Sequence, residues 1–149
     1  MSPYPSRRLP LSLFKPAGSG GGEKFDYLNT GSYIGELIRF EEGRLRDDFD
    51  DRENGPKQQM VNWIWKLYQS DGVTPVMHDG EQVEYTAETS NATGRRSNAA
   101  AYFSAHLKRP YTGGNLDDTM QECIGKRVML IITDKDSGWK KTDVFQAGV

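Results

Sequence analysis

The segment 59–68, Gln-Met-Val-Asn-Trp-Ile-Trp-Lys-Leu-Tyr, constrains the fold most because apolar and polar residues alternate along it. When the chain is extended, one face carries Val61, Trp63, Trp65 and Leu67. The opposite face carries Asn62, Lys66 and Tyr68. This period of two is typical of a β-strand with one buried face. We therefore predict a strand whose tryptophans point into the core.

Four further segments have strand character, and one segment has helical character. The expected strands are residues 31–40, 82–89, 126–133 and 139–145. Gly35 interrupts the first of them, and we expect a sharp bend there. Ser97 is suited to cap a helix over residues 98–109, and residues 116–123 favour a second, short helical turn before Gly125. The predicted order is β-β-β-α-β-β.

This order predicts an all-β domain with one helix. It matches the five-stranded OB-type Greek-key barrel, whose first strand bends to serve both halves of the barrel. A small α+β sandwich contains the same elements, because one sequence does not specify which strands are neighbours. Residues 1–24 are rich in Pro and Gly and are expected to form a flexible N-terminal arm, which leaves residues 25–149 for the barrel domain. Residues 41–57 are polar and are expected to be a long charged loop.

Composition limits the class of protein. The chain has 149 residues, of which 36% are hydrophobic, so it has room for one domain and one core. No run of apolar residues approaches the roughly 18 that a membrane span needs, and the N-terminus lacks a secretory apolar region. The lone Cys123 agrees with a reducing compartment, and we predict a cytoplasmic protein without membrane contact. The net charge of −2 means that any site for nucleic acid must be local.

The sequence contains no recognisable catalytic motif. His78 and His106 are far apart, and no HExxH, GxSxG or EF-hand spacing occurs. The glycine-rich stretch 18–24 differs from a phosphate-binding loop because Glu23 replaces the glycine that precedes the lysine. Carboxylates within residues 47–53 could hold a divalent cation, although a solvated loop is the simpler interpretation. We predict that the protein is not an enzyme and has no cofactor.

Aromatic and basic residues in the expected strands and loops are candidates for binding a single-stranded nucleic acid. OB barrels stack bases on exposed aromatic side chains and contact phosphates with cations from flanking loops. The candidates are Arg44, Arg46, Arg52, Lys57, Lys66, Tyr68, Arg95, Arg96, Lys135, Trp139, Lys140 and Lys141. Arg95 and Arg96 precede the helix N-terminus, where backbone amides favour phosphate, but a solvated loop also explains them. Lys108 and Arg109 are explained by the dipole at the helix C-terminus.

Several stretches together resemble a known group of proteins. They include Phe14-Lys-Pro-Ala17, Gly31-Ser-Tyr-Ile-Gly-Glu-Leu-Ile, Trp63-Ile-Trp65, the segment 97–109, Ile124-Gly-Lys-Arg-Val128 and Lys141-Thr-Asp-Val-Phe145. Over roughly residues 14–147 the chain resembles small OB-fold proteins of tailed bacteriophages, of the single-stranded DNA-binding type. The resemblance implies a non-catalytic DNA-binding protein that assists phage replication or recombination. The acidic insertion after the first strand and the near-neutral charge depart from a strong DNA binder.

A second function is compatible with the same sequence. The arm of residues 1–24 and the open edge of the barrel could instead make contacts within an oligomer or a virion. In that case the chain is a protein-interaction or assembly module, and nucleic acid is irrelevant to it. The sequence does not separate DNA from RNA as the ligand of the first function.

Overall fold

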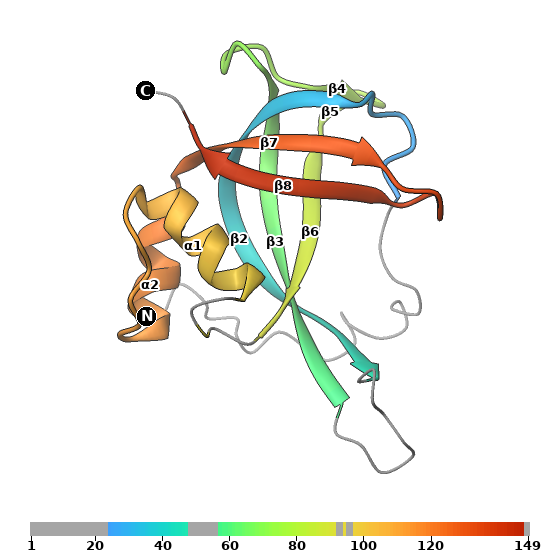
Figure 1. Cartoon of the computed structure of the whole chain (residues 1–149). Coiled ribbons are helices and arrows are strands. Elements are labelled where there is room, and N and C mark those ends of the chain that lie inside the picture. Colours follow the sequence, from blue (N-terminus) through green and yellow to red (C-terminus); the bar gives the residue numbers. More distant parts are fainter. Residues whose placement is uncertain (1–23, 48–56, 92–93, 95–96, 148–149) are drawn as a thin grey trace.

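The structure is a computed structural model that describes residues 24–47, 57–91, 94 and 97–147. Its strands are β2 (Gly31–Asp47), β3 (Lys57–Gln69), β4 (Met77–His78), β5 (Glu81–Gln82), β6 (Glu84–Ser90), β7 (Arg127–Asp134) and β8 (Lys140–Gln146). Its helices are α1 (Asn98–Leu107) and α2 (Leu116–Cys123) (Figure 1). The predicted arm of residues 1–24 lies outside the described residues except for its last residue, Lys24.

One five-stranded antiparallel sheet forms the body of the protein, in the order β6-β3-β2-β7-β8. The central strand β2 pairs with β3 along its length and with β7 through its first residues, so it belongs to both halves of the sheet. Figure 1 shows β7 and β8 running across β2, β3 and β6, which gives the sheet a strong curl. Among the described residues no backbone ladder joins β6 to β8. The two edge strands are linked instead by a 2.6 Å hydrogen bond between the hydroxyls of Tyr85 and Thr142.

The register shift nearest to Gly35, where a bend was predicted, lies two to four residues further along β2. Pairing of β2 with β3 shifts register between Leu37 and Arg39, where a bulge accommodates the curvature. Gly35 is required for a different reason. A Cβ atom at this position would lie 2.7 Å from Cδ1 of Leu130 and 3.0 Å from Cβ of Trp65. Glycine at 35 therefore lets the backbone of β2 approach these two side chains.

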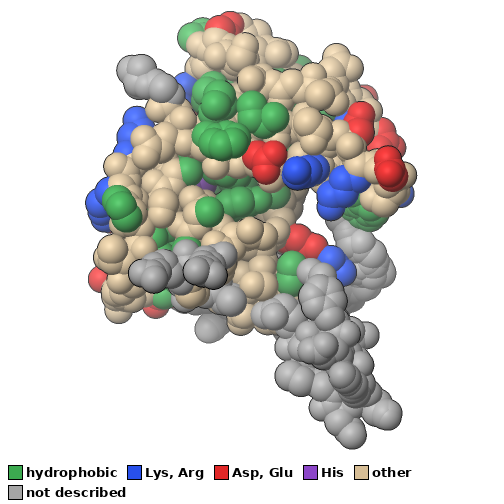
Figure 2. Space-filling model, viewed as in Figure 1, with side chains coloured by type: hydrophobic (Ala, Val, Ile, Leu, Met, Phe, Trp, Pro, Cys, Tyr) green, Lys and Arg blue, Asp and Glu red, His purple; other side chains and the backbone are tan. Residues whose placement is uncertain are grey.

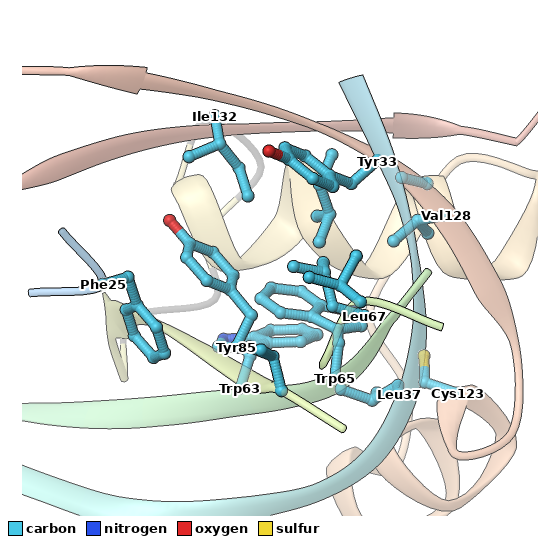
Figure 3. Close-up of a cluster of buried hydrophobic side chains, with 14 of the residues drawn as sticks. Phe25, Tyr33, Leu37, Trp63, Trp65, Leu67, Tyr85, Cys123, Val128 and Ile132 are labelled. Carbon is cyan, nitrogen blue, oxygen red and sulfur yellow. The ribbon is translucent and has the colours of Figure 1, made fainter. Parts of the chain in front are cut away.

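The core lies inside the curl, and its centre is aromatic. Trp63 and Trp65 are 1% and 0% exposed, which confirms the prediction that this face of β3 points inward. Each indole N–H has a buried acceptor: Trp63 donates to Oγ1 of Thr89 at 3.0 Å, and Trp65 donates to Nε2 of His106 at 2.9 Å. Figure 3 shows both tryptophans among side chains from β2, β3 and β6 that point toward one another.

Helix α1 packs against β8 and β6 and covers part of the opening between them. It begins where Ser97 predicts, because the Ser97 hydroxyl accepts a hydrogen bond from the N–H of Ala100 at 3.1 Å. Phe103 buries its ring against Trp63, with 5.0 Å between ring centroids. The short helical turn predicted at residues 116–123 is helix α2, capped by the side chain of Asn115. The described fold therefore has two helices, and the prediction of one helix was wrong.

The expected loop over residues 41–57 was also wrong at both of its ends. Strand β2 continues to Asp47 and β3 begins at Lys57, so these two strands form a hairpin arm that extends beyond the ladder between β3 and β6. The side-chain amide of Gln59 crosses this hairpin and donates to the carbonyl of Gly43 at 3.0 Å. The sequence predicted a loop here because these residues are polar and lack the alternation that marks a half-buried strand.

Candidate nucleic-acid interface

The outer surface of the sheet carries an unbroken row of apolar side chains. Strand register places Tyr68 of β3 beside Ile34 of β2, Ile34 beside Met129 of β7, and Met129 beside Phe145 of β8. We call these four residues the apolar row. Phe145 is 48% exposed, and the other three are half-buried. Figure 2 shows hydrophobic side chains gathered on the surface over β7 and β8, with acidic and basic side chains next to them.

Arg127 borders the apolar row and is held by three different groups. Its Nε donates to a carboxylate oxygen of Glu36 at 3.2 Å, and its Nη1 donates to the carbonyl of Gly72 at 2.6 Å. Its guanidinium carbon lies 4.5 Å from the centroid of the Tyr68 ring. A guanidinium over an aromatic face is a favourable cation–π contact. Arg127 therefore fixes the Tyr68 ring and the loop after β3 relative to the sheet.

An open groove of about 640 Å³ adjoins the apolar row, and we call it the basic groove. It lies between the end of α1, the start of β7, the end of β8 and the loop after β3. It is lined by Ile34, Ser70, Asp71, Gly72, His106, Leu107, Lys108, Lys126, Arg127, Met129 and Ala147. Its cations are Lys108, Lys126 and Arg127, and its apolar floor is Ile34, Leu107 and Met129. Neither Lys108 nor Lys126 forms an ion pair with any residue that the structure describes.

Asp71, the one carboxylate among the described residues that line the basic groove, is already engaged. One oxygen of Asp71 accepts hydrogen bonds from the backbone N–H groups of Val73 and Thr74, and the other accepts from the Thr74 hydroxyl. The Thr74 N–H is the main reason that the pKa of Asp71 is lowered. Asp71 therefore shapes the loop after β3, and no ion pair joins it to Lys108 or Lys126 in the described residues.

The cations predicted on β2 and β3 lie on a part of the sheet that carries matching carboxylates. Arg44 forms a two-pronged contact with Glu88, with distances of 2.6 Å from Nη2 and 3.1 Å from Nε. These hydrogen bonds raise the pKa of Arg44. Lys66 stands between Glu36 and Glu84 in the strand register. A phosphate approaching this region would compete with carboxylates that already neutralise the cations.

Two further predicted cations on the hairpin arm are described only through their backbones. Arg46 pairs with Gln58, and Lys57 pairs with Asp47. The positions of their side chains lie outside the described part of the structure. Arg52, Arg95 and Arg96 also lie outside it, so the phosphate site expected before the helix stays a prediction.

The turn between β7 and β8 holds the remaining predicted residues. Trp139 is 37% exposed, and the Lys24 ammonium lies 5.0 Å from the centroid of its ring. Lys135 and Lys141 are exposed. The Lys140 side chain is only 7% exposed, because its ammonium donates to the carbonyl of Leu28 at 2.9 Å and to Asp134 at 2.5 Å. Lys140 holds the segment before β2 against the sheet and does not present a free cation.

The predicted residues therefore do not form one surface. Tyr68 and Lys66 lie together near the basic groove, Arg44 lies on the hairpin arm, and Trp139 lies beyond the start of β2. The sequence interpretation missed Lys108, Lys126 and Arg127, together with Met129 and Phe145. Alternation along residues 126–133 places Arg127 and Met129 on one face and was a usable signal. Lys108 was assigned to the helix dipole alone, and the proximity of Lys126 follows only from the fold.

Two titratable side chains of types common in catalysis, His106 and Cys123, are buried in the core. His106 has both ring nitrogens occupied, one by the Trp65 indole and the other by the Tyr102 carbonyl at 2.7 Å. Burial raises the pKa of the Cys123 thiol to about 12, so the unreactive thiol form persists at neutral pH. Within the described ranges, no three His, Cys, Asp or Glu side chains are placed to hold a metal ion.

A second hollow of about 440 Å³ lies beside the β4–β5 hairpin. The ring of Tyr27 stacks on His78 there, with 3.6 Å between centroids. The hollow also contains Asp79, Glu81 and Glu84. Its charge is negative, so it is unsuited to phosphate.

No known protein family and no curated protein sequence matches the chain. None of the helices in the described part of the chain is long and apolar enough to cross a membrane.

Proposed function

We propose that the chain is a non-catalytic single-stranded DNA-binding protein built on an OB-type barrel. The order of the five long strands supports this assignment. Counted along the chain, they lie as third, second, first, fourth and fifth, and the first strand serves both halves of the sheet. An OB barrel has the same neighbours, with its third and fifth strands meeting. Here the hydroxyls of Tyr85 and Thr142 bridge these two strands.

The observation that carries the proposal is the apolar row with cations along one side. Its four side chains come from adjacent strands about 4.8 Å apart, so the row is about 14 Å long, enough for about four stacked bases at 3.4 Å each. Tyr68 and Phe145 stand at its two ends, and Arg127 and Lys126 border it. Bases stacking on the row would leave the backbone phosphates near these cations.

The test is fluorescence anisotropy of labelled oligo-dT at about 50 and about 200 mM salt, because phosphate contacts make affinity fall as salt rises. Phe145→Ala should weaken binding roughly 5- to 100-fold, as expected for loss of a stacking platform. Lys126→Gln should weaken binding and reduce the salt dependence. Lys135→Gln is the matched control, because it removes the same charge from an exposed lysine away from the row.

Two outcomes refute the proposal: no binding at low salt, or equal affinities for Phe145→Ala and wild type. A parallel titration with oligo-rU distinguishes DNA from RNA. A role in phage replication or recombination would follow only if DNA binding is found.

A second candidate function is protein interaction or assembly, favoured by the position of Phe145. This exposed aromatic lies on β8, the edge strand of the sheet, where a partner protein could contact both the ring and the strand. If Phe145→Ala disrupts an oligomer while oligo-dT binding is absent, this second function replaces the first.

A further inference from the structure

The basic groove has an apolar floor as well as cations, and this combination specifies what can occupy it. Lys108 and Lys126 supply positive charge at the rim, while Ile34, Leu107 and Met129 form the floor. A ligand that satisfies both must carry carboxylates or phosphates close to an apolar group. A small inorganic anion would leave the floor uncovered.

The chain itself contains a segment with this chemistry. Residues 48–56 read Asp-Phe-Asp-Asp-Arg-Glu-Asn-Gly-Pro, so one aromatic residue, Phe49, is flanked by Asp48, Asp50 and Asp51. This segment joins β2 to β3 at the end of the hairpin arm. Its net charge is negative, because Asp48, Asp50, Asp51 and Glu53 outnumber Arg52. It is complementary to the groove in both charge and apolar character.

The hairpin arm leads away from the groove of its own molecule. Ile34 in the groove and Asp47 at the start of the segment are on the same strand, separated by roughly 40 Å of β-strand at the usual rise per residue. A loop between Asp47 and Lys57 that must return to its start reaches no more than about 17 Å from the hairpin. Figure 1 shows the arm pointing away from the end of α1 and the start of β7, where the groove lies.

We propose that the acidic segment 48–56 of one copy of the chain occupies the basic groove of a second copy. Phe49 packs on the apolar floor, and the neighbouring aspartates pair with Lys108 and Lys126. The contact joins two different surfaces, so each copy keeps one free groove and one free segment. Repetition gives a head-to-tail chain of molecules or, where the rotation closes, a ring. The proposal does not depend on binding of nucleic acid.

The test is sedimentation velocity of the full chain without nucleic acid. At about 50 mM NaCl the protein should form species larger than a monomer as its concentration rises, and about 300 mM NaCl should weaken the association at least tenfold. A groove variant, Lys108→Asn with Lys126→Glu, should be monomeric. A segment variant, Phe49→Ser with Asp50→Asn and Asp51→Asn, should also be monomeric. Lys135→Glu is the matched control and should associate like the wild type.

Mixing the two variants distinguishes this contact from any symmetric one. The groove variant retains an intact segment, and the segment variant retains an intact groove, so an equimolar mixture should form dimers and nothing larger. Because a dimer also requires both variants to be folded, its formation answers the objection that they are merely unfolded. Lys126→Gln alone, a milder change, should weaken wild-type association about tenfold.

Three results overturn the proposal. The first is a wild type that stays monomeric at low salt and high concentration, which would leave the groove for nucleic acid or another protein. The second is association of either variant as strong as that of the wild type. The third is a mixture that stays monomeric although thermal melts show both variants folded. If association is found and oligo-dT does not bind, the proposal stands while the proposed DNA-binding function fails.

Discussion

Acidification should destabilise the protein through His106, whose buried ring is held in the neutral form. Its Nδ1–H donates to the carbonyl of Tyr102, so its Nε2 is left to accept the Trp65 indole N–H. Protonation of Nε2 would remove this acceptor and place a charge against the rings of Trp63 and Trp65. Burial accordingly lowers the pKa of His106 from 6.5 to about 4.

The size of the effect follows from this difference. The unfolded chain binds a proton at His106 below about pH 6.5, whereas the folded chain does not until about pH 4. Between these values the unfolded form holds more protons, so the free energy of unfolding falls as the pH falls. Above about pH 6.5 His106 is neutral in both the folded and the unfolded chain, so it causes no loss in the free energy of unfolding. At pH 4 the loss approaches about 3 kcal/mol, from 1.36 kcal/mol per pKa unit.

Urea unfolding of the wild type, His106→Gln and His78→Gln at pH 7, 5.5 and 4 measures this loss. His106→Gln keeps a carbonyl acceptor for Trp65 and has no group that titrates, so its stability should depend less on pH in this window. Carboxylates such as Asp71 and Glu122, whose pKa values are lowered in the fold, affect all three proteins equally at lower pH. His78→Gln is the control and should follow the wild type. Equal pH dependence of His106→Gln and the wild type would refute the reasoning.

Two other substitutions test the packing. Gly35→Ala should destabilise the protein by about 1–3 kcal/mol because the new Cβ overlaps core side chains. Gly31→Ala is the control and should change the melting temperature little, because a Cβ there has nothing within 4 Å. Equal melting temperatures of the two variants would show that β2 can move aside. Lys140→Met should lower the free energy of unfolding by about 1–3 kcal/mol, because it leaves the Leu28 carbonyl without its donor. Lys141→Met changes an exposed lysine, and its free energy of unfolding should stay within about 0.5 kcal/mol of the wild type. Chemical denaturation that ranks the two lysine variants in the opposite order would contradict the structural role of Lys140.

Strands in which apolar and polar residues alternate were predictable from the sequence. Strand ends that lack this alternation were not. Trp63 and Trp65 were placed correctly because their strand alternates, and Ser97 was placed correctly because its hydroxyl caps a helix locally. The start of β3 and the end of β2 were missed because their residues are polar and lack the alternation that marks a half-buried strand. Gly35 was assigned to a bend, although the close approach of Leu130 and Trp65 explains it.

The candidate site was less predictable because it depends on which strands are neighbours. Tyr68 and Phe145 are far apart in sequence and share a row only through the registers of β3, β2, β7 and β8. The partner of Arg44 was equally hidden, since Glu88 comes from β6. The alternation along one strand predicts which face of the sheet a side chain lies on. Its charge partners depend on which strands are neighbours in the sheet.

The hydroxyl contact between Tyr85 and Thr142 also has a mechanical meaning. Every other neighbouring pair among the five long strands is joined by a ladder of backbone hydrogen bonds, whereas within the described residues β6 and β8 meet through side chains. Separating these two strands therefore breaks no ladder, and the curl of the sheet can widen along this seam while β2 and β3 keep all their pairings. A widening of the curl between β6 and β8 would therefore have to break the hydroxyl contact of Tyr85 with Thr142 and the packing of α1 on both strands.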